Sequence, residues 1–137
     1  MSYNAEPKDW YRVDKFLHKV PFDQVADVYN QCDILLKTSY LESFSYPPLE
    51  MMATGGYAVV VPNDGNKEYL LDGENCLLYP LGKIEEGIAA IERICTDKGY
   101  RSICMKVVSK LHSQETGRVS VKNRSFIRRL IKAKERL

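Results

Sequence analysis

Apolar and polar residues follow one another in blocks that predict strands and helices in turn. Four short runs are typical of strands: residues 12–18 (RVDKFLH), 33–38 (DILLKT), 57–62 (YAVVVP) and 76–79 (CLLY). The run at 57–62 is apolar at successive positions, as expected of a parallel strand that is buried on both faces. We therefore expect it to lie between 33–38 and 76–79 in a sheet.

The segments between these runs show helical spacing. A helix is expected after Pro21, with one apolar face made by Phe22, Val25, Val28, Tyr29 and Cys32. Pro47 and Pro48 fit only the first turn of a helix, so a second helix is expected from there to Gly55 and Gly56. A polar loop follows, with a single helical turn around residues 68–71. Two more amphipathic helices are indicated by Ile84, Ile88, Ile91, Ile94 and Cys95, and by Ile103, Val107 and Leu111.

Strands that alternate with crossover helices predict an α/β fold with a parallel sheet covered by helices on both faces. The length of 137 residues, with 45% hydrophobic and 28% charged residues, suits one domain. We expect its core at residues 12–96 and C-terminal helices at 98–137.

Several function classes are not expected from the composition. There is no apolar run of about 18 residues and no signal-peptide pattern, so a cytoplasmic protein is the expectation. The four cysteines form no CxxC pair and have only His18 and His112 as possible co-ligands, so we expect reduced, buried thiols and no metal site. Neither GxGxxG nor GxxxxGK occurs, and no cofactor is expected.

The basic residues are concentrated in residues 118–137, where eight of them face one acidic residue, a net charge of +7. Apolar residues recur there at helical spacing, which indicates a basic amphipathic helix. The favoured interpretation is docking on its own domain. Contact with an acidic partner or the inner face of a membrane is the alternative. Nucleic acid is not expected, because aromatic residues do not interleave with the charges.

The stretch ESFSYPPLE, residues 42–50, lies between the strand at 33–38 and the helix begun by the prolines. In parallel sheets, ligands bind at the carboxyl ends of strands. Glu42 is expected in the loop and Glu50 in the first helical turn, so the two carboxylates flank a helix N-terminus. Backbone N–H groups there can hold an anion, which the helix dipole favours by about 0.3–1 kcal/mol; the residues concerned are Ser43, Phe44, Ser45 and Tyr46.

An anion held between two carboxylates suits a ligand with hydroxyl groups at both ends and phosphate in the middle, such as a nucleotide sugar. Taken alone, Glu50 is an acid that complements the helix dipole and Glu42 is a solvated loop residue. A glycoside hydrolase also uses paired carboxylates, but these face each other across one bond, roughly 5–9.5 Å apart. Glutamates on either side of one helix start fit a phosphate-bridged ligand better.

Glu42 and Glu50 in ESFSYPPLE resemble the Glu-x7-Glu motif of family 4 glycosyltransferases, the retaining enzymes of the GT-B fold. The similarity continues through Ser39 upstream and through the Gly-Gly helix end, the Val-rich strand, a loop with Glu68 and the DGEN turn downstream. It covers residues 12–96. The resemblance implies part of a Rossmann-like C-terminal donor-binding domain, and surface polysaccharide biosynthesis as the setting.

The resemblance also implies roles. Glu50 would accept hydrogen bonds from the ribose hydroxyls, and Glu42 would stand beside the transferred sugar and stabilise the positive charge that develops at its anomeric carbon. Residues 43–46 would donate to sugar and phosphate. The nucleobase would rest near the turn formed by His18, Lys19 and Val20. The family needs no metal ion, and the nucleotide sugar is a substrate.

The chain departs from the family pattern in three ways. Ser45 stands where the family usually has glycine, so the fine geometry there is in doubt. The lysine and arginine that neutralise the pyrophosphate in the family have no counterpart in the sequence. The family's N-terminal domain, which would bind a glycan or lipid-linked acceptor, also has no counterpart, so we expect this chain alone to be inactive.

The family strand order, 3-2-1-4-5-6, would separate residues 12–18 from the other strands by two strands. We therefore expect 12–18 to move beside 33–38, or the chain to self-associate through that edge. Three other functions stay open: a noncatalytic nucleotide-sugar-binding module, a GT-B epimerase or phosphorylase, and an interaction domain that uses the basic C-terminal helix.

Overall fold

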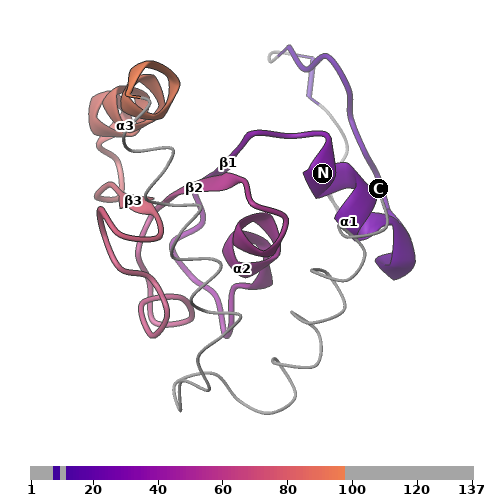
Figure 1. Cartoon of the computed structure of the whole chain (residues 1–137), viewed down its shortest axis with the longest axis horizontal. Coiled ribbons are helices and arrows are strands. Elements are labelled where there is room, and N and C mark those ends of the chain that lie inside the picture. The colour runs from indigo at the N-terminus through magenta and orange to yellow at the C-terminus, as the bar shows by residue number, and fades with distance from the viewer. Residues whose placement is uncertain (1–7, 10–11, 98–137) are drawn as a thin grey trace.

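The computed structural model describes residues 8–9 and 12–97. The expected helix with Ile103, Val107 and Leu111 and the basic segment 118–137 lie outside these residues. The described chain has the α/β fold that the sequence predicts, with a Rossmann-like parallel sheet between helices (Figure 1). Within it, no helix is long and apolar enough to cross a membrane.

Three parallel strands form the sheet in the order β1-β2-β3. They are β1 (Ile34–Lys37), β2 (Tyr57–Val60) and β3 (Leu77–Leu78). Ile34 lies opposite Tyr57, and Val59 lies opposite Leu77. The central position predicted for residues 57–62 is therefore confirmed.

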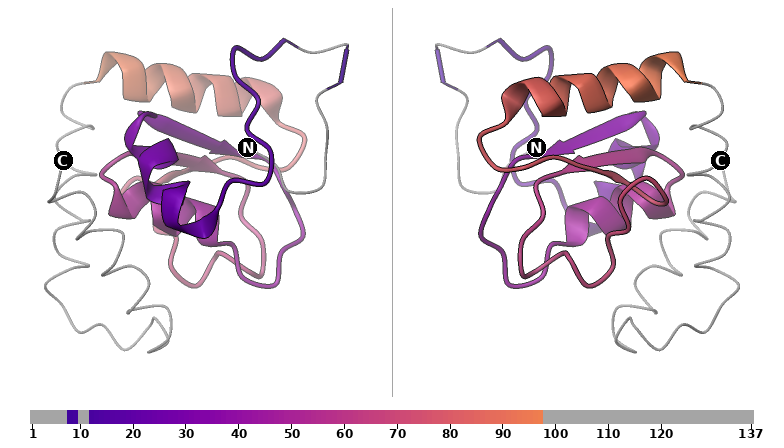
Figure 2. Two further views of the ribbon diagram at one scale, coloured as in Figure 1. Left: turned by 90° about the vertical axis from the view of Figure 1, so that its right-hand side faces the viewer. Right: turned by 90° about the vertical axis from the view of Figure 1, so that its left-hand side faces the viewer.

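The two faces of β2 explain its continuous apolar sequence. Ala58 and Val60 pack against Leu49 and Met52 of α2 (Tyr46–Ala53). Val59 and Val61 point to the other face, where α3 (Ile84–Thr96) contributes Ile94, which is 1% exposed. Figure 2 shows α3 on one side of the sheet and α2 on the other. Burial on both faces leaves no position in this strand for a polar residue.

The helix expected from Pro47 to the two glycines is present as α2, which begins one residue earlier, at Tyr46. Pro47 and Pro48 lie in its first turn, where the missing N–H group of proline costs no hydrogen bond. At the other end Gly55 has φ 79°, and its N–H donates to the carbonyl of Met52 at 3.0 Å. A left-handed residue that closes the last turn is the usual role of glycine at this position.

The helix expected after Pro21 consists of a 3-10 turn, η1 (Phe22–Gln24), followed by α1 (Val25–Asn30). Val25 and Tyr29 form a small apolar cluster with Val20 and with Met51 of α2. This cluster joins α1 to the same face of the sheet that α2 covers. The turn expected around 68–71 lies slightly earlier, because the N–H groups of Tyr69 and Leu70 both donate to the carbonyl of Asn66.

The apolar stripe predicted for α3 is only partly buried. Ile94 is buried, and Ile91 packs beside it, but Ile84 is 67% exposed and Ile88 is 51% exposed. The burial predicted for the cysteines is also wrong in part. Cys76 is buried, whereas Cys32 and Cys95 are exposed, and none of the three forms a disulfide within the described residues.

Residues 12–17 form no strand and His18 is a single bridge residue, so the expected strand at 12–18 is absent. A strand needs a neighbour to pair its backbone groups, and among the described residues β1 pairs only with β2. Leu17 instead packs against the cluster around α1. The prediction that 12–18 lies beside 33–38 is therefore wrong for the described chain, and self-association through that edge stays a prediction.

Candidate functional site

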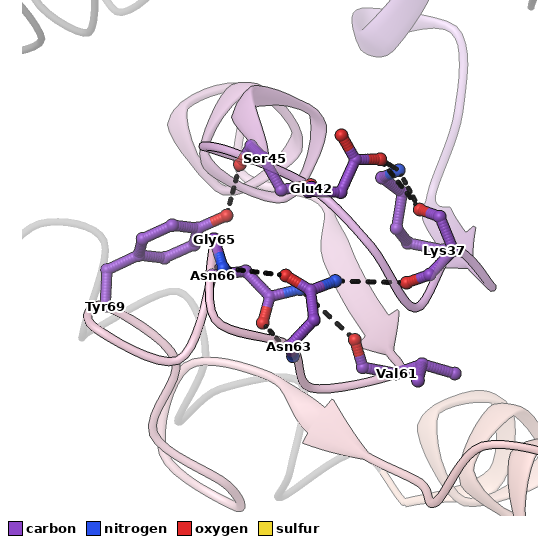
Figure 3. A network of polar contacts seen from close by, with 9 residues as sticks. Lys37, Glu42, Ser45, Val61, Asn63, Gly65, Asn66 and Tyr69 are labelled. Carbon is purple, nitrogen blue, oxygen red and sulfur yellow. Dashed lines mark hydrogen bonds and ion pairs between the residues drawn. The ribbon is translucent and has the colours of Figure 1, made fainter.

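Three segments meet at the carboxyl end of the sheet, where the sequence predicts a ligand site (Figure 3). They are the loop after β1, the first turn of α2 and the loop after β2. Hydrogen bonds from Asn63 to Ser39 and from Ser45 to Gly65 join the loop after β2 to the other two segments. The site is therefore built by residues that are 20 or more positions apart in sequence.

The Glu42 carboxylate is held from the end of β1. Its Oε1 accepts a hydrogen bond from Ser39 Oγ at 2.8 Å and forms an ion pair with Lys37 Nζ, which also donates to Ser39 Oγ. The side chain of Glu42 is 30% exposed and that of Lys37 is 16% exposed. Hydrogen bonds from Lys37 and then Ser39 lower the pKa of Glu42 below its usual value. Glu42 is thus an ionised carboxylate in a defined position, and not the solvated loop residue of the alternative interpretation.

The loop after β2 holds Ser39 by hydrogen bonds. Asn63 Nδ2 donates to the Ser39 carbonyl at 3.0 Å, and Asn63 Oδ1 accepts from the Gly65 amide at 3.0 Å. The backbone N–H of Asn63 in turn donates to Asn66 Oδ1 at 2.8 Å. Asn66 Nδ2 donates to the Val61 carbonyl at 3.1 Å. Asn66 is fully buried, so this loop is anchored to the end of β2.

Gly65 lets the two loops come into backbone contact. A Cβ atom at this position would lie 2.4 Å from the Glu42 carbonyl oxygen and 2.8 Å from its carbon. These are backbone atoms and cannot turn aside as a side chain can. A residue other than glycine here would push the Glu42 segment outward.

Ser45 is the N-cap residue of α2 and is 1% exposed. Its backbone N–H donates to the Gly65 carbonyl at 3.1 Å, so the expectation that this N–H faces a ligand is wrong. Its Oγ is buried and has no hydrogen-bond partner among the described residues. Tyr69 donates its hydroxyl hydrogen to the Ser45 carbonyl, and burial raises the pKa of Tyr69.

The other residues of this turn are at least partly exposed to solvent. Ser43 and Tyr46 are exposed, and Phe44 is half-buried between the rings of Tyr46 and Tyr69, with centroid distances of 4.9 Å and 5.7 Å. No described residue accepts a hydrogen bond from the amide of Ser43 or Phe44. These two amides therefore remain candidate donors to a ligand.

Glu50 lies one residue beyond the first turn of α2, since the helix begins at Tyr46. The expected first-turn position is therefore wrong. Glu50 is 8% exposed and accepts a hydrogen bond from the Tyr29 hydroxyl of α1. Burial raises the pKa of Glu50, and the bond from Tyr29 offsets part of this rise.

The turn at His18, Lys19 and Val20 is separate from the polar network. Val20 is buried in the cluster with α1, and Lys19 has φ 50°, a left-handed conformation that costs a side-chain-bearing residue roughly 1–2 kcal/mol. His18 lines an open groove of about 510 Å³ between residues 15–18 and the outer side of η1 and α1. Neither Glu42 nor Glu50 lines this groove.

The sequence analysis did not identify several residues of the site, among them Lys37, Asn63, Tyr69 and Tyr29. Lys37 had a signal, because it is a charged residue at the carboxyl end of an otherwise apolar strand, five positions before Glu42. Asn63 directly follows the strand run at 57–62. Tyr29 was assigned to an apolar helix face, and nothing in the sequence indicates that its hydroxyl meets Glu50. Among the described residues, no group of three or more histidine, cysteine or acidic side chains could hold a metal ion.

Comparisons with known proteins identify the family of the chain. The family described as Glycosyl transferases group 1 matches residues 13–109. The O-antigen biosynthesis protein RfbC of Myxococcus xanthus is 40% identical over 62 residues, which is 45% of this chain and 5% of that protein. The D-inositol 3-phosphate glycosyltransferase of Kribbella flavida is 30% identical over 105 residues, which is 77% of this chain and 24% of that protein. This chain therefore spans a small part of each of these relatives, and by its match over most of its length it belongs to the group 1 glycosyltransferases.

Proposed function

We propose that this chain is the donor-binding part of a retaining, family 4-type glycosyltransferase of GT-B architecture, and that the site at the carboxyl end of the sheet binds a nucleotide sugar. The observation that carries the proposal is the pair of glutamates around the start of α2, each held by its own partner. Glu42 is paired with Lys37, and Glu50 accepts from Tyr29.

The two carboxylates have opposite electrostatic surroundings, which suits two different roles. Glu42 has a lowered pKa and is partly exposed, so it offers a permanent negative charge to a reacting group. In the proposal it stabilises the positive charge that forms when the bond from the sugar to phosphate breaks. Glu50 is buried beside α1 and is 8% exposed, and in the proposal its carboxylate accepts hydrogen bonds from two ribose hydroxyls.

The turn between the glutamates supports a phosphate position. The amides of Ser43 and Phe44 have no acceptor in the described chain, and α2 follows directly, so its dipole favours an anion beside them. The Ser45 hydroxyl is buried and has no partner in the part of the chain that the structure describes, and in the proposal it donates to a phosphate oxygen. We propose this hydroxyl as the functional difference that Ser45 brings in place of the family's usual glycine.

The setting of the reaction is proposed from the relatives. One is named as an O-antigen biosynthesis protein and the other as a glycosyltransferase that acts on an inositol phosphate. We propose that this chain serves surface polysaccharide assembly on the cytoplasmic side, together with a domain that holds a glycan or lipid-linked acceptor. Residues 118–137 would contribute basic charge toward a membrane surface.

The test uses the complete enzyme that this proposal requires. With a panel of uridine, guanosine and thymidine diphosphate sugars, we expect release of the nucleoside diphosphate and a product with the donor's anomeric configuration. Glu42→Gln should lower kcat by about 10²-fold or more with little change in donor affinity, because its charge acts mainly in the transition state. Glu86→Gln, an exposed change on α3, is the matched control and should leave both values unchanged. Near-normal turnover of Glu42→Gln would assign Glu42 a structural role, and an inverted product would contradict retention.

A further inference from the structure

The Lys37 ammonium group lies at the centre of the contacts to Glu42. Lys37 is the last residue of β1, and its Nζ contacts both Ser39 Oγ and Glu42 Oε1 (Figure 3). Ser39 Oγ closes the triangle by donating to the same Glu42 oxygen at 2.8 Å. One carboxylate oxygen therefore accepts from both donors, and the orientation of the carboxylate is fixed.

This ion pair differs from an ordinary surface pair. The side chains of Lys67 and Asp64 also form an ion pair, at 2.5 Å, but they are 68% and 92% exposed. Lys37 is 16% exposed, so its charge is largely removed from water. A cation in that position must be paired and hydrogen-bonded to be stable, and its partner is then held in turn.

Hydrogen bonds and backbone packing hold Ser39 and Glu42 in place next to Lys37. Asn63 Nδ2 donates to the Ser39 carbonyl, and the buried Asn66 anchors Asn63. Gly65 packs against the backbone of Glu42 itself. The end of β1 and the loop after β2 thus determine where the Glu42 carboxylate points.

We propose that Lys37 is a positioning residue, which holds the Glu42 carboxylate ionised and directed at the anomeric carbon of the donor sugar. The inference rests on the proposed function. It gives this chain a cation of its own at the reacting end of the site, in addition to the lysine and arginine that the family supplies to the pyrophosphate.

Among the described residues, the charged or titratable groups on the elements packed around Glu42 include Lys37, Tyr69, Glu50 and the exposed Asp64–Lys67 ion pair. Lys37 of β1 contacts the carboxylate directly. Tyr69, in the loop after β2, is influenced by the charges of Glu42 and of Glu50 on α2. Lys37 is the cation in contact with the Glu42 carboxylate, whereas the charge of Lys67 is paired with Asp64, so removal of Lys37 should make Glu42 easier to protonate. A protonated Glu42 cannot stabilise positive charge, and turnover should then fall at a higher pH than in the wild type.

The experiment measures kcat, the donor KM and the pH dependence of kcat in the complete enzyme for Lys37→Met, Lys37→Arg and Lys67→Met. We expect Lys37→Met to lower kcat on the order of tenfold, the cost of one charged hydrogen bond, with the donor KM within about twofold. Its acidic limb should move to higher pH. Lys37→Arg should restore the limb toward the wild-type position, and Lys67→Met, which removes an exposed lysine, should match the wild type.

If the acidic limb of the pH profile of Lys37→Met stays at the wild-type pH, the proposal is overturned. This holds even if kcat is lower, because a purely structural role of Lys37 gives that result. Ser39→Ala is a second variant in case Lys37→Met unfolds. It keeps the charge and removes one donor, and it should move the limb in the same direction by a smaller amount, whereas an unmoved limb would again overturn the proposal. A wild-type enzyme without transfer activity would instead contradict the proposed function.

Discussion

At the residue scale, the site depends on two glutamates whose surroundings differ more than their sequence positions suggest. Both belong to one nine-residue stretch, yet Glu42 is ion-paired and Glu50 is buried beside a tyrosine. A carboxylate that is buried without a cation is costly to ionise, and proteins keep such groups where a function requires them. The free-energy cost of ionising the buried Glu50 should therefore lower the stability of the fold near neutral pH.

We expect Glu50→Gln to raise the melting temperature near neutral pH. Burial raises the pKa of Glu50 in the folded chain above its unfolded value, so the protonated carboxyl is the form that the fold favours. Its contribution is fully present below the unfolded pKa and is lost as the pH rises through the folded pKa. Glutamine stays neutral throughout, so the gain should be clear at about pH 7 and vanish at about pH 4.

Thermal unfolding followed by circular dichroism at both pH values measures this, with Glu74→Gln, an exposed loop change, as the control. A melting temperature of Glu50→Gln below that of the wild type at neutral pH would contradict the argument, because the carboxylate would then stabilise the fold.

At the element scale, the sequence determined the parts whose pattern is set by local geometry. The continuous apolar run of β2 predicted its central place, and the prolines and glycines around α2 predicted where that helix begins and ends. Residues 12–18 were mispredicted because a strand depends on a neighbour that no local pattern shows. The half-exposed stripe of α3 has a similar cause, since periodicity identifies an apolar face and not what covers it.

In the site, too, features set by local sequence could be predicted and contacts between distant residues could not. Glu42, Glu50 and the turn between them could be found because they are close in sequence and lie at a strand end. The contacts of Asn63 with Ser39 and of Tyr69 with Ser45 join residues 24 positions apart, and their register depends on how the two loops pack. The burial of Glu50 could not be read from its neighbours either, because it results from α1 lying against α2.

The backbone of Glu42 leaves no room for a side chain at Gly65, so Gly65→Ala should destabilise the fold by about 1–3 kcal/mol, the usual cost of overpacking. It should also weaken nucleotide binding, because the added methyl group would displace the Glu42 and Ser43 backbone. Urea unfolding and calorimetry measure the two effects.

Gly73→Ala is the matched control for this change. Gly73 has φ 73° and open space around its Cβ position, so alanine there should cost roughly 1–2 kcal/mol of backbone strain and leave nucleotide affinity intact. Equal affinities for the Gly65→Ala and wild-type chains would show that this packing does not position the site.

At the scale of the whole molecule, the described sheet has β1 at one edge. Leu36 in this strand is 48% exposed, and a strand edge that no other described strand pairs with favours pairing with another chain. We expect the chain to self-associate in a concentration-dependent way, measured by sedimentation velocity.

Leu36→Lys should weaken this association by about tenfold or more, since it replaces apolar burial by charge. Leu81→Lys, at a residue that is 59% exposed before α3, is the control and should associate like the wild type. A wild-type chain that remains monomeric at every concentration would contradict the edge argument.

The central claim is that the site at the carboxyl end of the sheet binds the nucleotide part of a sugar donor, and calorimetry of this chain with uridine, guanosine and thymidine diphosphates tests it most directly. We expect at least one nucleotide to bind, and Glu50→Gln to weaken that binding by about 1–2 kcal/mol, because the ribose hydroxyls lose a charged acceptor. Glu86→Gln on α3, across the sheet from the site, should bind as the wild type does. Equal affinity of the wild type and Glu50→Gln for every nucleotide would contradict the claim.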